Sequence, residues 1–191
     1  MTTSFRATLI SAVAALALSG CAATEKAATQ VQGAAQAQTT PTLSTTDATF
    51  FDLAARSGIE AVTFGQLARD QAGRAAVKSF ATRMVDEHTT VNQQLVQLAR
   101  VKGINPPTSM DDPHDTQFAQ LQALHGRAFD RAYLNGQVTD HQATLQLFQN
   151  EARSGTDPDV KAFAANTVPA IQMHLDMARR LGGRAPAASA S

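Results

Sequence analysis

Hydrophobic side chains recur at α-helical spacing over almost the whole of residues 47–181. Apolar residues three and four positions apart form one stripe per segment, and no stretch shows the alternation typical of a β-strand. Glycine and proline interrupt the pattern and divide it into separate helices. We predict an all-α domain of ordinary size at 47–181. Its long helices are expected at about 47–72, 74–102, 127–153 and 157–181, with a short helix at about 112–125.

The connection between the second and third long helices extends from Gly103 to Gly126. Adjacent antiparallel helices are usually joined by about 2–8 residues, so this connection is too long for a simple turn. Its length suits a crossover that runs the full height of the bundle, as in ferritin-like folds. We therefore predict a ferritin-like four-helix bundle with a long crossover between helices 2 and 3. An up-down-up-down bundle is the alternative.

The first helix carries a stripe of small residues at alternating spacings of four and three. Such a stripe lets a neighbouring backbone approach closely. The neighbour is either the second helix or another protomer, so a homodimer is compatible with the pattern. The stripe consists of Ala54, Gly58, Ala61, Gly65, Ala68 and Ala72.

The first twenty residues have the features of an export signal. Arg6 provides a positive charge, a short apolar run follows, and Leu18-Ser19-Gly20-Cys21 resembles the lipobox of bacterial lipoproteins. This resemblance implies cleavage before Cys21 and acylation of that residue. We expect residues 1–20 to be a lipoprotein signal peptide and Cys21 to attach the protein to a membrane. A secretory signal with an incidental cysteine is the alternative.

The remaining composition limits the partners of the chain. Lys and Arg number 16, Asp and Glu also number 16, and no basic cluster is present, which argues against nucleic acid. Residues 21–46, rich in Ala, Gln and Thr, are expected to form a flexible tether, and residues 182–191 a disordered tail. By resemblance to enterobacterial sorting rules, Ala22 after the cysteine favours the outer membrane. The sequence does not identify a protein partner.

One acid-base side chain lies near the middle of each long helix, on the apolar stripe. These four residues are Glu60, His88, His141 and His174. A buried carboxylate or imidazole needs a hydrogen-bond partner or a metal ion, because its desolvation is costly. Helix bundles build metal sites from side chains that project inward from facing helices. One carboxylate and three imidazoles suit a single Zn or Cu ion, and we predict that these four residues are its ligands.

Other residues near these positions fit a supporting role. Glu87 and Asp140 directly precede His88 and His141, and each acid could orient a neighbouring imidazole. Solvated acids at the bundle edge are the alternative. Met84 and Met177 would favour Cu(I), although methionine on a core stripe is usually a packing residue.

Three segments carry a resemblance to a known family: Val85 to His88, Phe129 to Tyr133, and Pro169 to Leu175. They resemble the exported bacterial ferritin-like family named domain of unknown function 4142, whose members are often labelled predicted outer membrane proteins. The resemblance covers about 47–181. Short pieces are also similar to a copper-associated ferritin-like family in which Met- and His-bearing helices recur. The resemblance implies the fold and an outer-membrane lipoprotein facing the periplasm, and it implies no established reaction.

A di-iron centre does not fit the sequence. Di-iron carboxylate bundles place Glu three residues before His on two of their helices, whereas Val85, Val138 and Ile171 occupy these positions here. His114 and His125 fall in the crossover, where we expect them to face solvent.

Three functional interpretations remain open. The first is a metal-binding envelope protein with a maintenance or stress role. The second is a non-catalytic interaction module whose Glu/His cluster is purely structural. The third is a hydrolytic or redox enzyme, which the chain supports least. It shows no Ser/His/Asp order, no glycine-rich phosphate loop and no Cys/His pair.

Overall fold

The computed structural model describes residues 43–182, and this part of the chain is built from α-helices without a β-sheet. The expected all-α class is therefore confirmed. The long helices begin and end within two residues of the expected positions, and the short helix ends three residues before its expected end. The helices are α2 (Thr45–Gln71), α3 (Ala75–Val101), α4 (Asp112–Gln122), α5 (Gly126–Ser154) and α6 (Pro158–Arg180).

The described residues do not include several features expected from the sequence. The signal peptide at 1–20, Cys21 and the tether up to residue 42 lie outside them, as do residues 183–191. Residues 45 and 46, expected in the tether, belong to α2 instead. Within residues 43–182, no helix is both long enough and apolar enough to cross a membrane.

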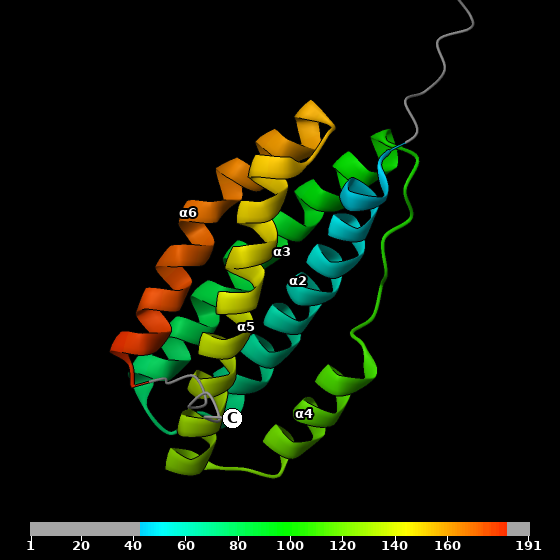
Figure 1. Cartoon of the computed structure of the whole chain (residues 1–191). Helices are drawn as coiled ribbons and strands as arrows, with labels where there is room; N and C mark the ends of the chain where they lie inside the picture. Colours follow the sequence, from blue (N-terminus) through cyan, green and yellow to red (C-terminus); the bar gives the residue numbers. More distant parts are fainter. Residues whose placement is uncertain (1–42, 183–191) are drawn as a thin grey trace, which may run out of the picture. The chain divides into compact units, whose positions relative to one another are not determined.

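Two helical hairpins, α2–α3 and α5–α6, form the bundle (Figure 1). The chain leaves the end of α3, returns along the bundle through α4, and starts α5 in the same direction as α3. Ion pairs confirm this arrangement: Lys102, after α3, lies 2.8 Å from Asp157 before α6. At the opposite end Arg74, before α3, lies 3.1 Å from Asp130 near the start of α5. The long crossover is thus confirmed, and the up-down-up-down alternative is wrong.

Side-chain caps begin three of the helices. Ser44 accepts a hydrogen bond from the backbone N–H of Asp47, and Asp157 accepts hydrogen bonds from Asp159 and Val160. Asp111 accepts one from the backbone N–H of His114 and so caps α4. These acceptors satisfy backbone donors that have no partner within the helix.

The small-residue stripe of α2 packs against α3 of the same chain. A Cβ atom built on Gly65 would lie 2.9 Å from a methyl carbon of Val85 and 3.3 Å from the carbonyl oxygen of Ala81. One built on Gly58 would meet the side chain of Asn92. The close approach of α2 and α3 therefore needs glycine at Gly65, where the backbone of α3 is in the way, whereas the end of the Asn92 side chain can move away from Gly58. The stripe serves an intramolecular contact.

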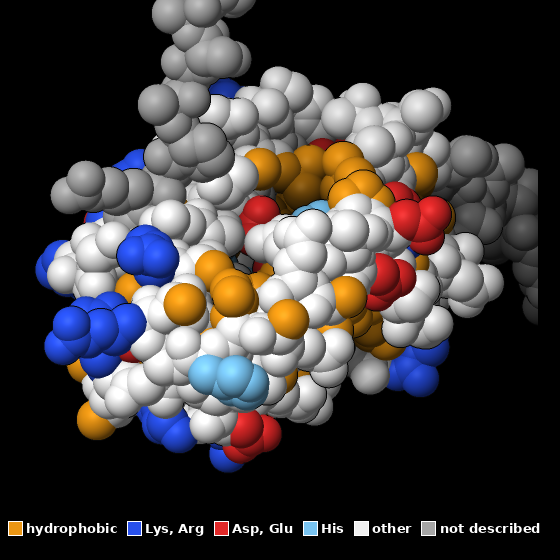
Figure 2. Space-filling view, turned by 90° about the horizontal axis from the view of Figure 1, so that it is seen from below, with side chains coloured by type: hydrophobic (Ala, Val, Ile, Leu, Met, Phe, Trp, Pro, Cys, Tyr) orange, Lys and Arg blue, Asp and Glu red, His pale blue; other side chains and the backbone are white. Residues whose placement is uncertain are grey.

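The apolar core is divided into two clusters by a layer of buried polar side chains. One cluster surrounds Phe64, Phe80 and Tyr133, and the other surrounds Phe50 and Phe148, whose rings pack edge to face at 4.9 Å. The polar layer between them contains Glu60, His88, Gln137, His141 and His174. Seen from below, the molecule shows Lys and Arg mainly at the left of the view, whereas Asp and Glu lie at the right, near the centre and at the bottom edge (Figure 2).

Candidate metal centre

Three imidazole rings from three helices meet in the middle of the bundle. His88 projects from α3, His141 from α5 and His174 from α6, and their exposed fractions are 7%, 4% and 2%. The ring centroids lie 5.4 Å apart for His88 and His141, 5.1 Å for His88 and His174, and 5.7 Å for His141 and His174. One nitrogen from each ring lies within 4.8 Å of the other two.

Hydrogen bonds on the outer side define the protonated nitrogen of two rings. The Nδ1 of His141 lies 3.0 Å from the carbonyl oxygen of Gln137, and the Nε2 of His174 lies 2.7 Å from a carboxylate oxygen of Glu87. A carbonyl and a carboxylate only accept, so these ring nitrogens carry the hydrogen. The other nitrogen of each neutral ring is therefore a lone-pair acceptor.

The inner nitrogens have no hydrogen-bond partner among the described residues. They are His88 Nε2, His141 Nε2 and His174 Nδ1. A buried polar atom without a partner is costly, and three such atoms gathered in one place need a common explanation. A metal ion would satisfy all three, and metal-binding histidines characteristically donate their outer N–H to a carbonyl or a carboxylate.

The surroundings keep these rings neutral. Burial and the neighbouring His174 together lower the pKa of His141 to about 3, and the Gln137 carbonyl opposes this shift. Burial and the two other imidazoles hold the pKa of His88 well below its usual value. Burial also lowers the pKa of His174, and the contact with Glu87 opposes that shift. Neutral imidazole is the form that binds metals.

The spacing is slightly wider than a loaded site requires. Metal–nitrogen distances of about 2.0–2.1 Å in a tetrahedron separate neighbouring ligand atoms by about 3.3–3.4 Å. The three nitrogens, within 4.8 Å of one another, must each move by about 1 Å or less toward a common centre. Small rotations of the side chains provide such movement.

Glu60 does not join the three imidazoles, although it is buried, with an exposed fraction of 2%. Its carboxyl group accepts a hydrogen bond of 3.5 Å from the side-chain amide of Gln137 and faces Asp140. Burial and the charge of Asp140 raise the pKa of Glu60 well above its usual value. Of the four expected ligands, the three histidines thus lie together, whereas Glu60 lies apart from them and pairs with Asp140.

A cavity lies beside the Glu60–Asp140 pair. Its volume is about 200 Å³, and Arg56, Asp111 and His114 contribute to its wall. Burial raises the pKa of Asp140, and the nearby His114 partly opposes this rise. Each carboxyl group of this pair therefore favours its protonated form more than an exposed carboxyl group does.

Of the residues predicted to support the site, only some lie beside an imidazole. Glu87 does contact a neighbouring imidazole, that of His174, in the manner anticipated for an acid that precedes a histidine. Asp140 faces Glu60 instead of a ring. Met84 is fully buried in the apolar cluster around Phe64, and Met177 packs against the same cluster. These two side chains pack in the core and are not grouped with the imidazoles.

The two crossover histidines differ in exposure. His125 is exposed, as expected. His114 is only partly exposed, because it hydrogen bonds to Asp111 and lines the cavity beside Glu60. The expectation that His114 faces solvent was therefore wrong.

Sequence reasoning missed several polar residues around the centre. Gln137 is fully buried and contacts both groups, through its side chain to Glu60 and through its carbonyl to His141. Ser57 and Thr144 share a hydrogen bond of 2.7 Å beside the rings. The spacing of Gln137 four residues before His141 was the available sign, since residues at i and i+4 lie on one helix face.

A second carboxyl pair, Asp47 and Glu151, lies at the end of the bundle and was not predicted from the sequence. Asp47 accepts hydrogen bonds from the backbone N–H groups of Thr156 and Asp157. Although burial acts in the opposite direction, hydrogen bonds from Thr156 hold the pKa of Asp47 below its usual value. Burial and the adjacent Asp47 raise the pKa of Glu151 to about 7.

The sequence profile of a domain of unknown function, DUF4142, matches residues 32–181. The chain belongs to the DUF4142 family. This confirms the resemblance found in the sequence. A search of curated proteins gives no match.

Solved structures of another domain family share the fold. A DUF305 protein of Streptomyces coelicolor, described as secreted, superposes with a TM-score of 0.62 at 15% identity, over 74% of this chain and 97% of that one. A DUF305 fragment from Deinococcus radiodurans gives 0.66 at 16% identity, over 74% and 99%. CopM in its Cu(II)-bound form gives 0.60 at 14% identity, over 70% and 93%. At these identities the likeness shows the fold alone.

Proposed function

We propose that this protein binds one Zn or Cu ion in the bundle through His88, His141 and His174, and that it handles this metal in the bacterial cell envelope. The convergence of three buried, unpartnered imidazole nitrogens carries the proposal. In a purely structural cluster, the rings would be expected to bond one another or neighbouring donors. Here no residue of the described part of the chain, 43–182, provides such a partner for any of the three inner nitrogens.

The donor set limits the choice of metal. Three imidazole nitrogens without a thiolate or carboxylate suit Zn and Cu, whereas Mg, Ca and Mn favour oxygen ligands. A di-iron centre requires several carboxylates, and the Glu60–Asp140 pair lies apart from the histidine cluster. The likeness to CopM, whose structure is Cu(II)-bound, supports copper as the first metal to test.

Glu87 has a positioning role in this proposal. Its carboxylate accepts the hydrogen of His174 Nε2 and is also paired with Arg83 at 2.9 Å. These contacts direct His174 Nδ1 inward and increase the basicity of the ring. The outer hydrogen bond of His141 to Gln137 has the same effect on that ring.

The location of the protein is part of the proposal. The lipobox-like sequence at Cys21 supports an acylated outer-membrane anchor, and the secreted DUF305 neighbour supports a site outside the cytoplasm. The helical domain would then face the periplasm. Replacement of Cys21 by Ser should abolish acylation, because a hydroxyl cannot take the place of the thiol. A Cys21→Ser protein that keeps its normal mature mass and its membrane attachment would exclude the lipoprotein assignment.

Metal analysis tests the metal site directly. The full chain, produced by secretion and purified without a histidine tag, should retain about one Zn or Cu ion after dialysis. Its melting temperature should fall when a chelator removes the ion, because binding to the folded state stabilises that state. A chain without stoichiometric metal, with the same melting temperature in the presence and absence of chelator, would refute the site and favour the interaction-module alternative.

A further inference from the structure

We infer that the metal bound by the three imidazoles keeps one coordination position open, and that this position takes a small anion or, in its absence, water. This inference rests on the proposed function. It goes further by giving the centre a binding activity toward a second, exogenous ligand. The chemical class of that ligand is a monoanion of two or three atoms.

The ligand count leaves a position free. Zn and Cu sites of this type commonly take four ligands. Within residues 43–182, the group of candidate ligand atoms contains three nitrogens and no carboxylate or thiolate. Residues 43–182 therefore supply no fourth ligand of these types, which leaves a coordination position for an exogenous ligand. Three protein ligands with an exchangeable fourth position are typical of zinc sites that bind and activate small molecules.

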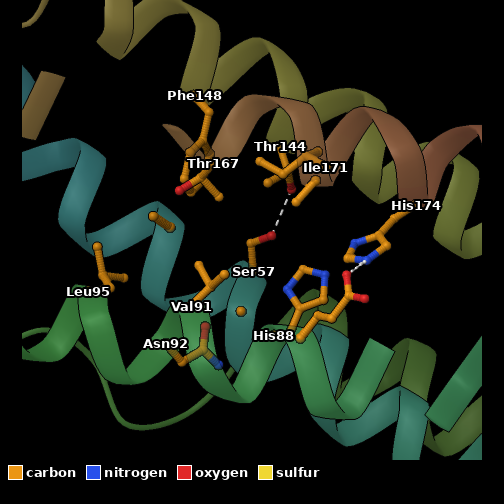
Figure 3. Close-up of a pocket in the computed structure, with 14 residues that line it drawn as sticks. Ser57, His88, Val91, Asn92, Leu95, Thr144, Phe148, Thr167, Ile171 and His174 are labelled. Atoms are coloured by element: carbon orange, nitrogen blue, oxygen red, sulfur yellow. Dashed lines mark hydrogen bonds and ion pairs between the residues drawn. The ribbon is translucent and has the colours of Figure 1, made fainter. Parts of the chain in front are cut away.

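A small cavity adjoins the three-imidazole cluster. Two of the rings, His88 and His174, form part of its wall, and its volume is about 30 Å³ (Figure 3). A buried water needs roughly 10–15 Å³ of such space, so this cavity accommodates about two waters or a short linear anion. Apolar side chains such as Leu95, Phe148 and Ile171 form much of the remaining wall and exclude larger polar ligands.

Two hydroxyl groups give the cavity a specific hydrogen-bonding wall. Ser57 on α2 and Thr144 on α5 both line it and bond each other at 2.7 Å (Figure 3). One hydroxyl donates to the other, so the second hydroxyl keeps its own hydrogen for another acceptor. Most other helix threonines behave differently: Thr63, Thr82, Thr90, Thr116, Thr139 and Thr167 donate to the carbonyl four residues earlier.

The charges around the cavity favour an anion once the metal is present. The three neutral imidazoles carry no negative charge, so these ligands do not neutralise the positive charge of the metal ion. Glu87 is the only acidic residue in the cavity wall among the described residues. Its charge is already engaged by Arg83 and His174. The side chain of Glu87 is 34% exposed, so the wall of the cavity reaches the surface at this residue.

Azide binding to the Cu(II)-loaded full chain tests the inference. Azide coordinated to Cu(II) produces a charge-transfer absorption band and changes the electron paramagnetic resonance spectrum. We expect saturable binding of one azide per copper. The double replacement Ser57→Ala and Thr144→Val should weaken azide binding about ten-fold or more, because it removes both hydroxyls of the pair and with them the hydrogen bond to the charged ligand.

Thr167→Val is the matched control. Thr167 lines the same cavity, but its hydroxyl donates to the carbonyl of Phe163 at 2.8 Å, so its loss should change azide affinity by less than about three-fold. Stoichiometric copper with no spectral change at high azide would overturn the open position and leave the metal site intact. Equal weakening in both variants would overturn the role of the hydroxyl pair. Failure of the unsubstituted chain to bind copper or zinc would overturn both proposals.

Discussion

Replacing His141 with Asn should change how the stability of the metal-free protein depends on pH. The amide nitrogen of Asn can occupy the position of Nδ1 and keep the hydrogen bond to the Gln137 carbonyl. The substitution therefore removes the titrating ring while preserving its backbone contact. The expected effect follows from the low pKa of His141, about 3 in the folded protein against 6.5 for an unperturbed imidazole.

The sign of this effect follows from proton binding. With a lowered folded pKa, His141 binds fewer protons in the folded state than in the unfolded state. Above pH 6.5 the ring is neutral in both states, and its contribution to the free energy of unfolding is fully present. This contribution is lost progressively as pH falls from 6.5 toward 3. Each pH unit in that window costs about 1.4 kcal/mol, so acidification from pH 7.5 to pH 5 costs about 2 kcal/mol through this ring.

The experiment must compare variants, because other buried groups act in the opposite direction. Glu60 and Glu151 have raised pKa values in the folded state, so each stabilises the protein more at pH 5 than at pH 7.5. In the unsubstituted protein, the effects of these carboxyl groups therefore partly cancel the effect of His141 on the pH dependence of stability. Its free energy of unfolding should be measured by urea denaturation at both pH values with chelator present, alongside His141→Asn.

The loss of stability on acidification should be smaller by about 2 kcal/mol in His141→Asn than in the unsubstituted protein. Equal losses in the two proteins would mean that His141 titrates normally in the folded state. The histidine cluster would then be hydrated or open, and the reasoning from burial would be refuted.

Three further predictions use other parts of the structure. Glu151→Gln should make the loss of stability on acidification larger, since it removes a group whose pKa is raised to about 7; an unchanged loss in urea titrations would contradict this. Gly65→Leu should destabilise the protein by about 1–3 kcal/mol or more, because the larger side chain overpacks against α3. Gly58→Ala should cost much less, because its Cβ meets the movable end of a side chain. Equal melting temperatures for the two variants would contradict the close contact at Gly65. Glu87→Gln should weaken metal affinity by about 10–100-fold in competition titrations, and unchanged affinity would show that Glu87 does not support His174.

The sequence predicted the fold well because its strongest patterns are local. The 3.6-residue period, the Asp157-Pro158 start of α6 and the length of the Gly103–Gly126 connection define helices and their order directly. The same period also predicted that Glu60 and the three histidines would be buried at a similar depth, and all four are buried.

The composition of the centre could not be predicted in full, because depth along a helix does not determine which neighbour a side chain faces. α2 packs against α3 and α5, so Glu60 meets Gln137 and Asp140 of α5 and does not reach the rings. The partner of His141 is a backbone carbonyl, which residue type does not reveal. The Ser57–Thr144 contact joins residues 87 positions apart and depends on the tertiary arrangement.

X-ray absorption at the metal edge of the Zn- or Cu-loaded full chain tests the central claim most directly. We predict three imidazole nitrogens and one exogenous oxygen or nitrogen ligand, with metal–nitrogen distances of about 2.0–2.1 Å for Zn. The pattern should be unchanged in Glu60→Gln, because Glu60 lies apart from the rings. A spectrum dominated by carboxylate oxygen or by sulfur, or one that changes in Glu60→Gln, would contradict a centre built from His88, His141 and His174.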